Sequence, residues 1–102
     1  MGAALEGLRI LDMTQYEAGT SSTQMLAWLG ADVVKIESPA GDPARRSFVT
    51  GPYDSQYYMN YNSNKRAIVL DLKQPEAREI FLGLVKKFDA FVENYGPGVM
   101  ES

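Results

Sequence analysis

The sequence predicts an α/β fold whose four strands form a doubly wound, mostly parallel sheet. Short apolar runs alternate with helix-length segments, and polar or glycine-bearing turns follow the runs. The last two strands are separated by one helix-length segment, which makes a βαβ unit with parallel strands. In open parallel sheets, ligands bind beyond the carboxyl ends of the strands and near helix N-termini. The turns after the strands are therefore the expected site.

The first strand and the first helix follow from local patterning. Residues 8–13, with the sequence LRILDM, predict a short strand, and residues 14–20 form a polar turn. A helix is expected over residues 21–29, with Gly30 as its C-terminal stop. Its apolar face, including a tryptophan expected in the core, consists of Met25, Leu26, Trp28 and Leu29.

A second strand and a long loop come next. Residues 32–37, with the sequence DVVKIE, predict a strand buried on both sides. Residues 38–64 are expected to be irregular because prolines and glycines interrupt any regular element, and so long a loop in a compact domain usually serves a function. The interrupting residues are Pro39, Gly41, Pro43, Gly51 and Pro52, and the tyrosines late in the loop are Tyr53, Tyr57, Tyr58 and Tyr61.

The second half predicts a strand over residues 67–72 and a helix from Gln74 or Pro75 to Lys87. A proline suits the first helical turn, and acidic residues near the start with lysines near the end complement the helix dipole. The buried stripe of this helix is expected to be Ile80, Phe81, Leu84, Val85 and Phe88.

A fourth strand is expected over residues 90–93, followed by a turn at 96–98 and the start of a helix at 99–102. The complete order is strand, helix, strand, long loop, strand, helix, strand. This order is that of an incomplete Rossmann-like sheet, with right-handed crossovers placing the helices on the sheet faces.

Composition excludes several functional classes. The 102 residues make at most one domain, and 45% hydrophobic residues support a core. The sequence contains no Cys and no His, which excludes thiolate and Ser-His chemistry within it and gives no expectation of a metal site. A net charge of -3 gives no reason to expect nucleic acid or an anionic membrane as partner. Without a secretory signal or a bilayer-spanning run, a cytoplasmic protein is expected.

Each motif is weak by itself. The turn at residues 15–23 places Gly19 and several hydroxyls at a helix N-terminus, but it matches neither the dinucleotide fingerprint nor the P-loop, and plain N-capping explains it. Lys65 and Arg66, taken alone, indicate surface charge. Arg45 and Arg46 in the long loop are either solvated or in contact with a ligand or a second subunit.

In their joint order, however, the motifs resemble CoA-transferase family III, which contains formyl-CoA and carnitine CoA-transferases and the related α-methylacyl-CoA racemases. The resemblance covers residues 5–101. The matching blocks are LEGLRILD at 5–12, Ala18-Gly19, LGADVVKIE at 29–37, Gly41-Asp42, NKRAI at 64–68, LDLK at 70–73 and VENYGPG at 92–98.

The resemblance implies that residues 1–102 are an N-terminal, partial CoA-binding domain. The parent enzyme would move CoA from an acyl-CoA to a carboxylic acid through an enzyme-bound aspartyl thioester, without metal or redox cofactor. The family's nucleophilic aspartate lies beyond residue 102, so no catalytic residue is assigned, and the 102 residues alone are expected to be inactive. The full-length enzyme is expected to be a homodimer of interlocked subunits.

The resemblance also assigns CoA-binding residues by position. Tyr16, Glu17 and Ala18 would line the thioester end of CoA. Lys65 would contact a phosphate. The turn formed by Asn94, Tyr95 and Gly96 would hold the pantetheine or nucleotide portion.

Three positions depart from the family pattern. Glu17 stands where some transferases carry Gln, and a carboxylate there would repel an anionic acyl group unless it were protonated or paired. Thr20 stands where the family often has Pro, and Ser38 where some relatives offer Arg for the adenine.

Two other functions remain open on the sequence. The LDLKQP and GVME blocks at 70–75 and 98–101 are shared with racemase relatives, which abstract a proton next to the thioester. The transferase is preferred because the DMTQ and NSNK blocks at 12–15 and 62–65 are closer to the transferase pattern. The other alternative is a truncated binding module without catalytic activity.

Overall fold

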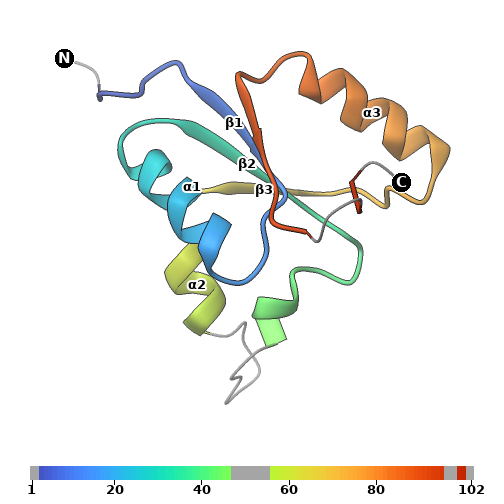
Figure 1. The fold of residues 1–102 in the computed structure, drawn as a ribbon, viewed down its shortest axis with the longest axis horizontal. Helices are drawn as coiled ribbons and strands as arrows, with labels where there is room; N and C mark the ends of the chain where they lie inside the picture. Colours follow the sequence, from blue (N-terminus) through green and yellow to red (C-terminus); the bar gives the residue numbers. More distant parts are fainter. Residues whose placement is uncertain (1–2, 47–55, 96–98, 101–102) are drawn as a thin grey trace.

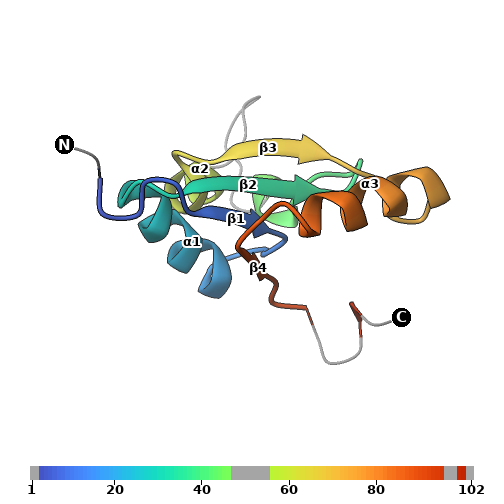
Figure 2. The same cartoon turned by 90° about the horizontal axis from the view of Figure 1, so that it is seen from above.

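The computed structural model describes residues 3–46, 56–95 and 99–100. Its strands are β1 (Arg9–Asp12), β2 (Asp32–Glu37), β3 (Arg66–Val69) and β4 (Ala90–Val92). Its helices are α1 (Ala18–Trp28), the 3-10 helix η1 (Pro43–Arg46), α2 (Gln56–Asn62) and α3 (Pro75–Val85). The strands form one sheet in the order β3-β2-β1-β4, and every pairing is parallel (Figure 2). The predicted α/β class with a parallel sheet is therefore confirmed.

Helices cover both faces of the sheet (Figure 1). Side chains alternate along a strand, so Ile10 and Val33 pack toward α1, whereas Leu11 and Val34 pack on the other face with α3. The predicted strand over residues 32–37 has the observed bounds of β2 and is buried along nearly its whole length. The central strands thus form the core, as the double winding predicts.

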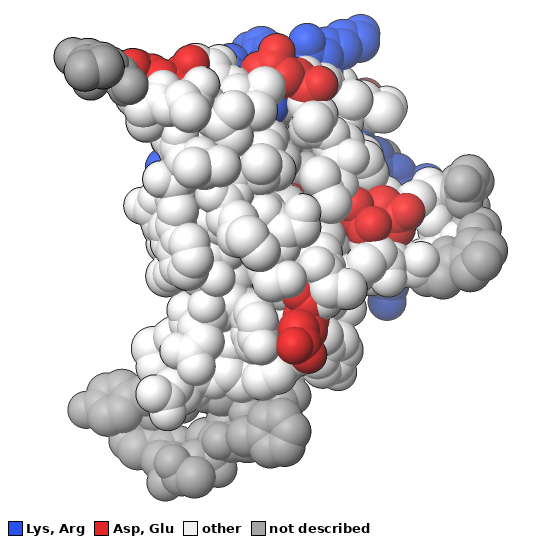
Figure 3. All heavy atoms as spheres, turned by 60° about the vertical axis from the view of Figure 1, so that its left-hand side comes forward, with Lys and Arg blue, Asp and Glu red and all other residues white. Residues whose placement is uncertain are grey.

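Helix α1 does not bury the face that the sequence predicts. The side chains of Met25, Trp28 and Leu29 are 56%, 61% and 51% exposed, so the prediction of Trp28 as a core residue is wrong. Figure 3 shows a broad area without charged side chains on the α1 side of the molecule. The buried residues of α1 are instead Thr20, Thr23, Gln24 and Ala27. The inward face is mixed because Ala27 packs with Ile10 and Val33, whereas Thr23 lies against Asp12 and donates a hydrogen bond to its carboxylate.

The long segment between β2 and β3 is partly regular, which corrects the prediction of an irregular loop. It contains η1 and α2, and Tyr58 and Asn62 of α2 are buried. Both lie on the α1 side, because Tyr58 packs beside Glu37 of β2. Tyr53, one of the four tyrosines, lies outside the described residues.

Strands β3 and β4 are parallel, as predicted, but they form opposite edges of the sheet with β2 and β1 between them. Helix α3 crosses the sheet to join them and packs against it through Phe81 and Leu84, which are half-buried, with Phe88 just beyond. The rest of the predicted stripe is open, since Ile80 and Val85 are exposed. Within the described part of the chain, no helix combines the length and hydropathy needed to cross a membrane.

Candidate functional site

The strand order reverses between β1 and β4, and this is where a crevice opens in sheets of this kind. The loops that leave these two strands are joined by the side chain of Asn94. Its Oδ1 accepts a hydrogen bond from the Gln15 N–H at 2.9 Å, and its Nδ2 donates to the Gln15 carbonyl at 2.7 Å. The structure therefore brings together two of the three predicted groups of site residues. Gly96 lies outside the described residues.

The turn from β1 into α1 presents the predicted residues Tyr16, Glu17 and Ala18 to solvent. Tyr16 has a φ of 60°, which is uncommon for a residue with a side chain. Glu17 is the N-cap residue of α1, but its carboxylate accepts a hydrogen bond from the Tyr61 hydroxyl at 3.0 Å instead of capping the helix. Since Ala18 begins α1, the first backbone N–H groups of the helix are among those that have no partner within it.

Behind this turn lies a buried ion pair between Asp12 and Lys65. Their Oδ2 and Nζ atoms are 2.9 Å apart, and their side chains are 0% and 1% exposed. The Lys65 ammonium also donates to the Asn62 Oδ1 at 2.9 Å and to the Thr20 carbonyl at 3.1 Å. Burial alone would raise the pKa of Asp12, but the charge of Lys65 and the hydrogen bonds from Thr14 prevail and lower it. All three donors of Lys65 therefore have partners inside the chain.

Two more ionic groups continue this buried network toward the carboxyl end of β2. Lys35 pairs with Asp42 at 2.8 Å, with both side chains 1% exposed, and donates to the Thr14 carbonyl at 2.7 Å. Glu37 accepts two hydrogen bonds of 2.7 Å from the Arg45 guanidinium. Burial would raise the pKa of Glu37, but Arg45 and the Asp42 backbone lower it to about 2. Arg45 is thus a partner of β2, not a solvated loop residue.

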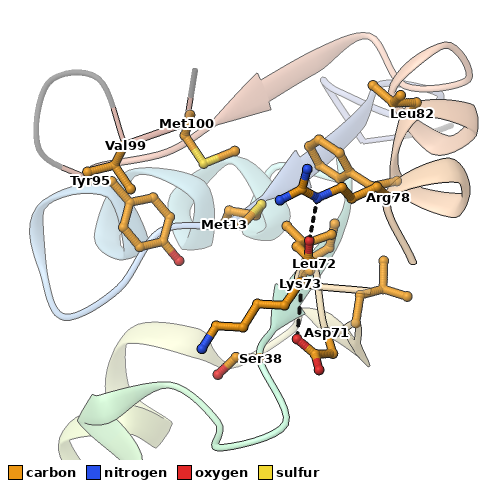
Figure 4. A pocket seen from close by; sticks show the side chains of 13 residues that line it. Met13, Ser38, Asp71, Leu72, Lys73, Arg78, Leu82, Tyr95, Val99 and Met100 are labelled. Carbon is orange, nitrogen blue, oxygen red and sulfur yellow. Dashed lines mark hydrogen bonds between the residues drawn. The ribbon is translucent and has the colours of Figure 1, made fainter. Parts of the chain in front are cut away.

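A cavity of about 570 Å³ opens on the opposite face of the sheet, beyond the carboxyl ends of β1, β2 and β3 (Figure 4). Its apolar walls come from Met13, Ile36, Leu70, Leu72, Phe81, Leu82, Val99 and Met100. Its polar lining consists of Ser38, Asp71, Lys73, Arg78 and Tyr95. Of the residues predicted for the site, Tyr95 lines this cavity.

Two cationic side chains face the cavity. Figure 4 shows the Lys73 ammonium extending toward Ser38 and the Arg78 guanidinium beside the Leu72 carbonyl. Arg78 is held there because its Nε donates to that carbonyl at 2.7 Å. The one carboxylate in the lining, Asp71, accepts a 3.2 Å hydrogen bond from the Lys73 backbone N–H. The cavity therefore combines an apolar body with two cations, which suits an organic anion.

Sequence reasoning missed Lys73 and Arg78 as site residues. A signal was present for Lys73, since this lysine occurs in the turn that follows a strand of a parallel sheet. No comparable signal marked Arg78, because an arginine in the second turn of an amphipathic helix is ordinarily solvated. Among the residues that the structure describes, no group of three or more carboxylates is placed to hold a metal ion.

Comparison with known proteins gives a consistent result. A family model described as CoA-transferase family III matches residues 5–102. The chain is 49% identical over 102 residues to a formyl-CoA:oxalate CoA-transferase of Streptomyces avermitilis, covering 99% of this chain and 25% of that protein. A protein of the same name from Bradyrhizobium sp. is 50% identical over 103 residues, with 99% and 24% covered.

Solved structures agree with these relatives. The chain superposes on a CAIB/BAIF family protein from Brucella suis with a TM-score of 0.91 and 34% identity, covering 99% of this chain and 28% of that one. The Rv3272 protein from Mycobacterium tuberculosis gives a TM-score of 0.91 and 35% identity, with 98% and 29% covered. The chain spans about a quarter of the length of the curated relatives it matches.

Proposed function

The chain belongs to CoA-transferase family III, and we propose that it forms the CoA-binding part of an enzyme that moves CoA from an acyl-CoA to a carboxylic acid. One observation supports this most strongly. The cavity that carries Lys73 and Arg78 is bordered by Met13 and Tyr95, which belong to the loops that follow β1 and β4. A long ligand with an anionic nucleotide at one end and a reactive group at the other fits this arrangement.

In this proposal the nucleotide end of CoA occupies the cavity. Met13, Ile36 and Leu70 supply apolar contacts for a planar base. Lys73 and Arg78 supply positive charge for phosphate, and the guanidinium of Arg78 is already oriented by its bond to Leu72. Pre-orientation reduces the entropy lost when the ligand binds.

The pantetheine arm would then pass Tyr95 and the Asn94 clamp toward the turn that contains Tyr16, Glu17 and Ala18. The thioester would lie near the start of α1, where backbone N–H groups and the positive end of the helix favour a developing oxyanion. The predicted roles of these five residues thus describe one continuous path from the cavity to the helix.

The phosphate contact that the resemblance predicts at Lys65 is not part of this proposal, because the surroundings of Lys65 favour it less than Lys73. Its ammonium is already surrounded by Asp12, Asn62 and Thr20, and its side chain is 1% exposed. A phosphate would have to displace these partners. Lys73 is exposed and reaches the cavity without such a cost.

The reaction itself would need a residue outside the 102. An aspartate carboxylate would attack the acyl thioester, giving a mixed anhydride and free CoA thiolate, and the thiolate would return to give an aspartyl thioester and release the first acid. The second acid would take over the CoA by the same two steps in reverse. Formate and oxalate, from the names of the relatives, are the first acids to test. Cytoplasmic location and a homodimer remain part of this proposal.

Calorimetric titration of the folded 102-residue chain with CoA tests the binding role. We expect saturable binding. We expect Lys73→Ala and Arg78→Ala each to weaken it by about tenfold to a hundredfold, because a charge-assisted hydrogen bond contributes about 1.5–3 kcal/mol. Lys86→Ala is the matched control, since Lys86 is exposed at the end of α3 and does not line the cavity.

A folded chain that releases no heat with CoA would contradict the proposal. So would equal affinity in the two cavity variants and the control. Incubating the same chain with formyl-CoA and oxalate should give no transfer, and turnover would show that the nucleophile lies within the 102 residues.

A further inference from the structure

We infer that Asp12 and Lys65 are positioning residues that hold the turn between β1 and α1 in its ligand-binding conformation without touching the ligand. The inference rests on the proposed function only for the identity of the ligand. The contacts that carry it lie wholly within the described part of the chain, and they join three segments that are far apart in sequence.

Asp12 is the hub of these contacts. Its Oδ1 accepts hydrogen bonds from the Thr14 N–H at 2.7 Å and the Thr14 hydroxyl at 2.5 Å. Its Oδ2 accepts from the Thr23 hydroxyl at 2.7 Å and pairs with Lys65. Because both oxygens are occupied and the side chain is fully buried, the carboxylate fixes where the turn leaves the strand and where α1 lies against it.

Lys65 reaches this hub from another part of the sheet. Lys65 comes immediately before β3, and β2 lies between β3 and β1 in the sheet. The Lys65 side chain nevertheless reaches Asp12 at the end of β1. There it pairs with Asp12 and donates to the Thr20 carbonyl in the first turn of α1. The ammonium therefore connects the first turn of α1 to the end of β1.

The turn between β1 and α1 also has contacts that involve neither Asp12 nor Lys65. Asn94 pairs with both backbone groups of Gln15, and the Thr20 hydroxyl donates to the Tyr16 carbonyl. Tyr16 itself adopts a φ of 60°. A residue in this region persists only where its surroundings over-determine the backbone. Removing the inner clamp should therefore shift the outer, ligand-facing residues.

The first test needs no ligand. Lys65→Met keeps the length of the side chain and removes its charge. In two-dimensional NMR spectra we expect the amide signals of residues 14–19 and the side-chain amide of Asn94 to move. The side-chain methyl signals of Val34 and Ile36, which lie on the other face of the sheet, should stay in place. Lys86→Met, the control, should move neither set. Unchanged signals over residues 14–19 in a folded Lys65→Met chain would overturn the inference.

The second test separates positioning from direct contact. Wild-type and Lys65→Met chains are titrated with CoA and with pantetheine, which carries no phosphate. A positioning role predicts a loss of about tenfold for both ligands, since small displacements of a site change affinity by this order. A loss confined to CoA, or no loss at all, would overturn the inference and identify Lys65 as a phosphate contact or a bystander.

The outcomes stay distinguishable from those of the proposed function. If the wild-type chain binds neither ligand, the proposed function fails, and the ligand-free spectra still decide the positioning role. If Lys65→Met does not fold, Thr23→Val replaces it, because this change keeps both charges and removes one donor to Asp12. It should move the same signals, and a folded Thr23→Val chain with unmoved signals would overturn the inference.

Discussion

The two faces of the sheet are built by opposite means. On the α1 side, the carboxyl half of the sheet carries the charged side chains Asp12, Lys35 and Glu37, each buried and each paired with an opposite charge. On the α3 side, the same strands present Leu11, Met13, Val34 and Ile36. The charged face is closed by α1, η1 and α2, whereas the apolar face opens into the cavity beyond the strand ends.

This difference separates support from binding. Buried ion pairs demand fixed geometry, since a charge without its partner is costly to bury, and so they hold the loops after β1 and β2 in place. The apolar wall and exposed cations of the other face need no fixed partner within the chain, and the cavity beside them leaves room for a ligand. We therefore assign support to the α1 side, whereas the α3 side carries the cavity in which the proposed function places the nucleotide.

The largest expected effect on stability comes from removing one partner of a buried ion pair on the charged face. Lys35→Met leaves Asp42 buried without its cation, and we expect the free energy of unfolding to fall by about 3–5 kcal/mol. Urea denaturation of the variant and of Lys86→Met measures it. A loss below about 1 kcal/mol, the size expected of an exposed pair, would contradict the supporting role of this face.

An intermediate effect should appear on acidification. The pKa of Glu37 is lowered from 4.5 to about 2, because its bonds to Arg45 and to the Asp42 backbone outweigh its burial. The stability that Glu37 contributes is thus complete above the unfolded pKa of 4.5 and is lost as the pH falls through about 2.

Urea denaturation at several pH values between 5 and about 2 measures this loss. Glu37→Gln, which cannot titrate, should be less stable than the wild type at neutral pH and should lose less stability over this interval. Parallel curves for the two proteins would show that Glu37 is not the residue whose protonation opens this face.

The smallest effect is expected on the outer surface of α1. Trp28→Ser should change the free energy of unfolding by no more than about 0.5 kcal/mol, because Trp28 is 61% exposed. Leu11→Ala, on the apolar face, is the contrasting variant and should cost about 2–5 kcal/mol. A large loss from Trp28→Ser would mean that the outer face of α1 is covered in solution.

Much of the fold was accessible from the sequence. The β-branched run of residues 32–37 predicted β2 with its observed bounds, and Pro75 marked the start of α3 as observed. These predictions succeed because they depend on local backbone preferences and on where turn residues separate one element from the next. Asn94 was assigned to the site from resemblance, and the structure adds the reason for its place, which is the clamp on Gln15.

Other features resisted prediction for a physical reason. A hydrophobic pattern assigns Met25 and Trp28 to the buried face of α1. Thr23 faces inward instead, because its hydroxyl donates to the buried carboxylate of Asp12. Gln24 is buried too, and its amide donates to Ser63. A lysine beside an arginine predicts two exposed side chains. The Lys65 side chain is nevertheless buried, because the fold brings it to Asp12, which lies 53 residues earlier in the chain.

Local periodicity and motifs taken in order were enough to predict the class of the fold, the family, and the order of the elements outside the segment between β2 and β3. The tertiary structure decided which face of α1 is buried, which cations remain free for a ligand, and where the cavity lies. Those outcomes depend on pairing between distant residues, since a charged side chain is buried only where the fold brings it a partner.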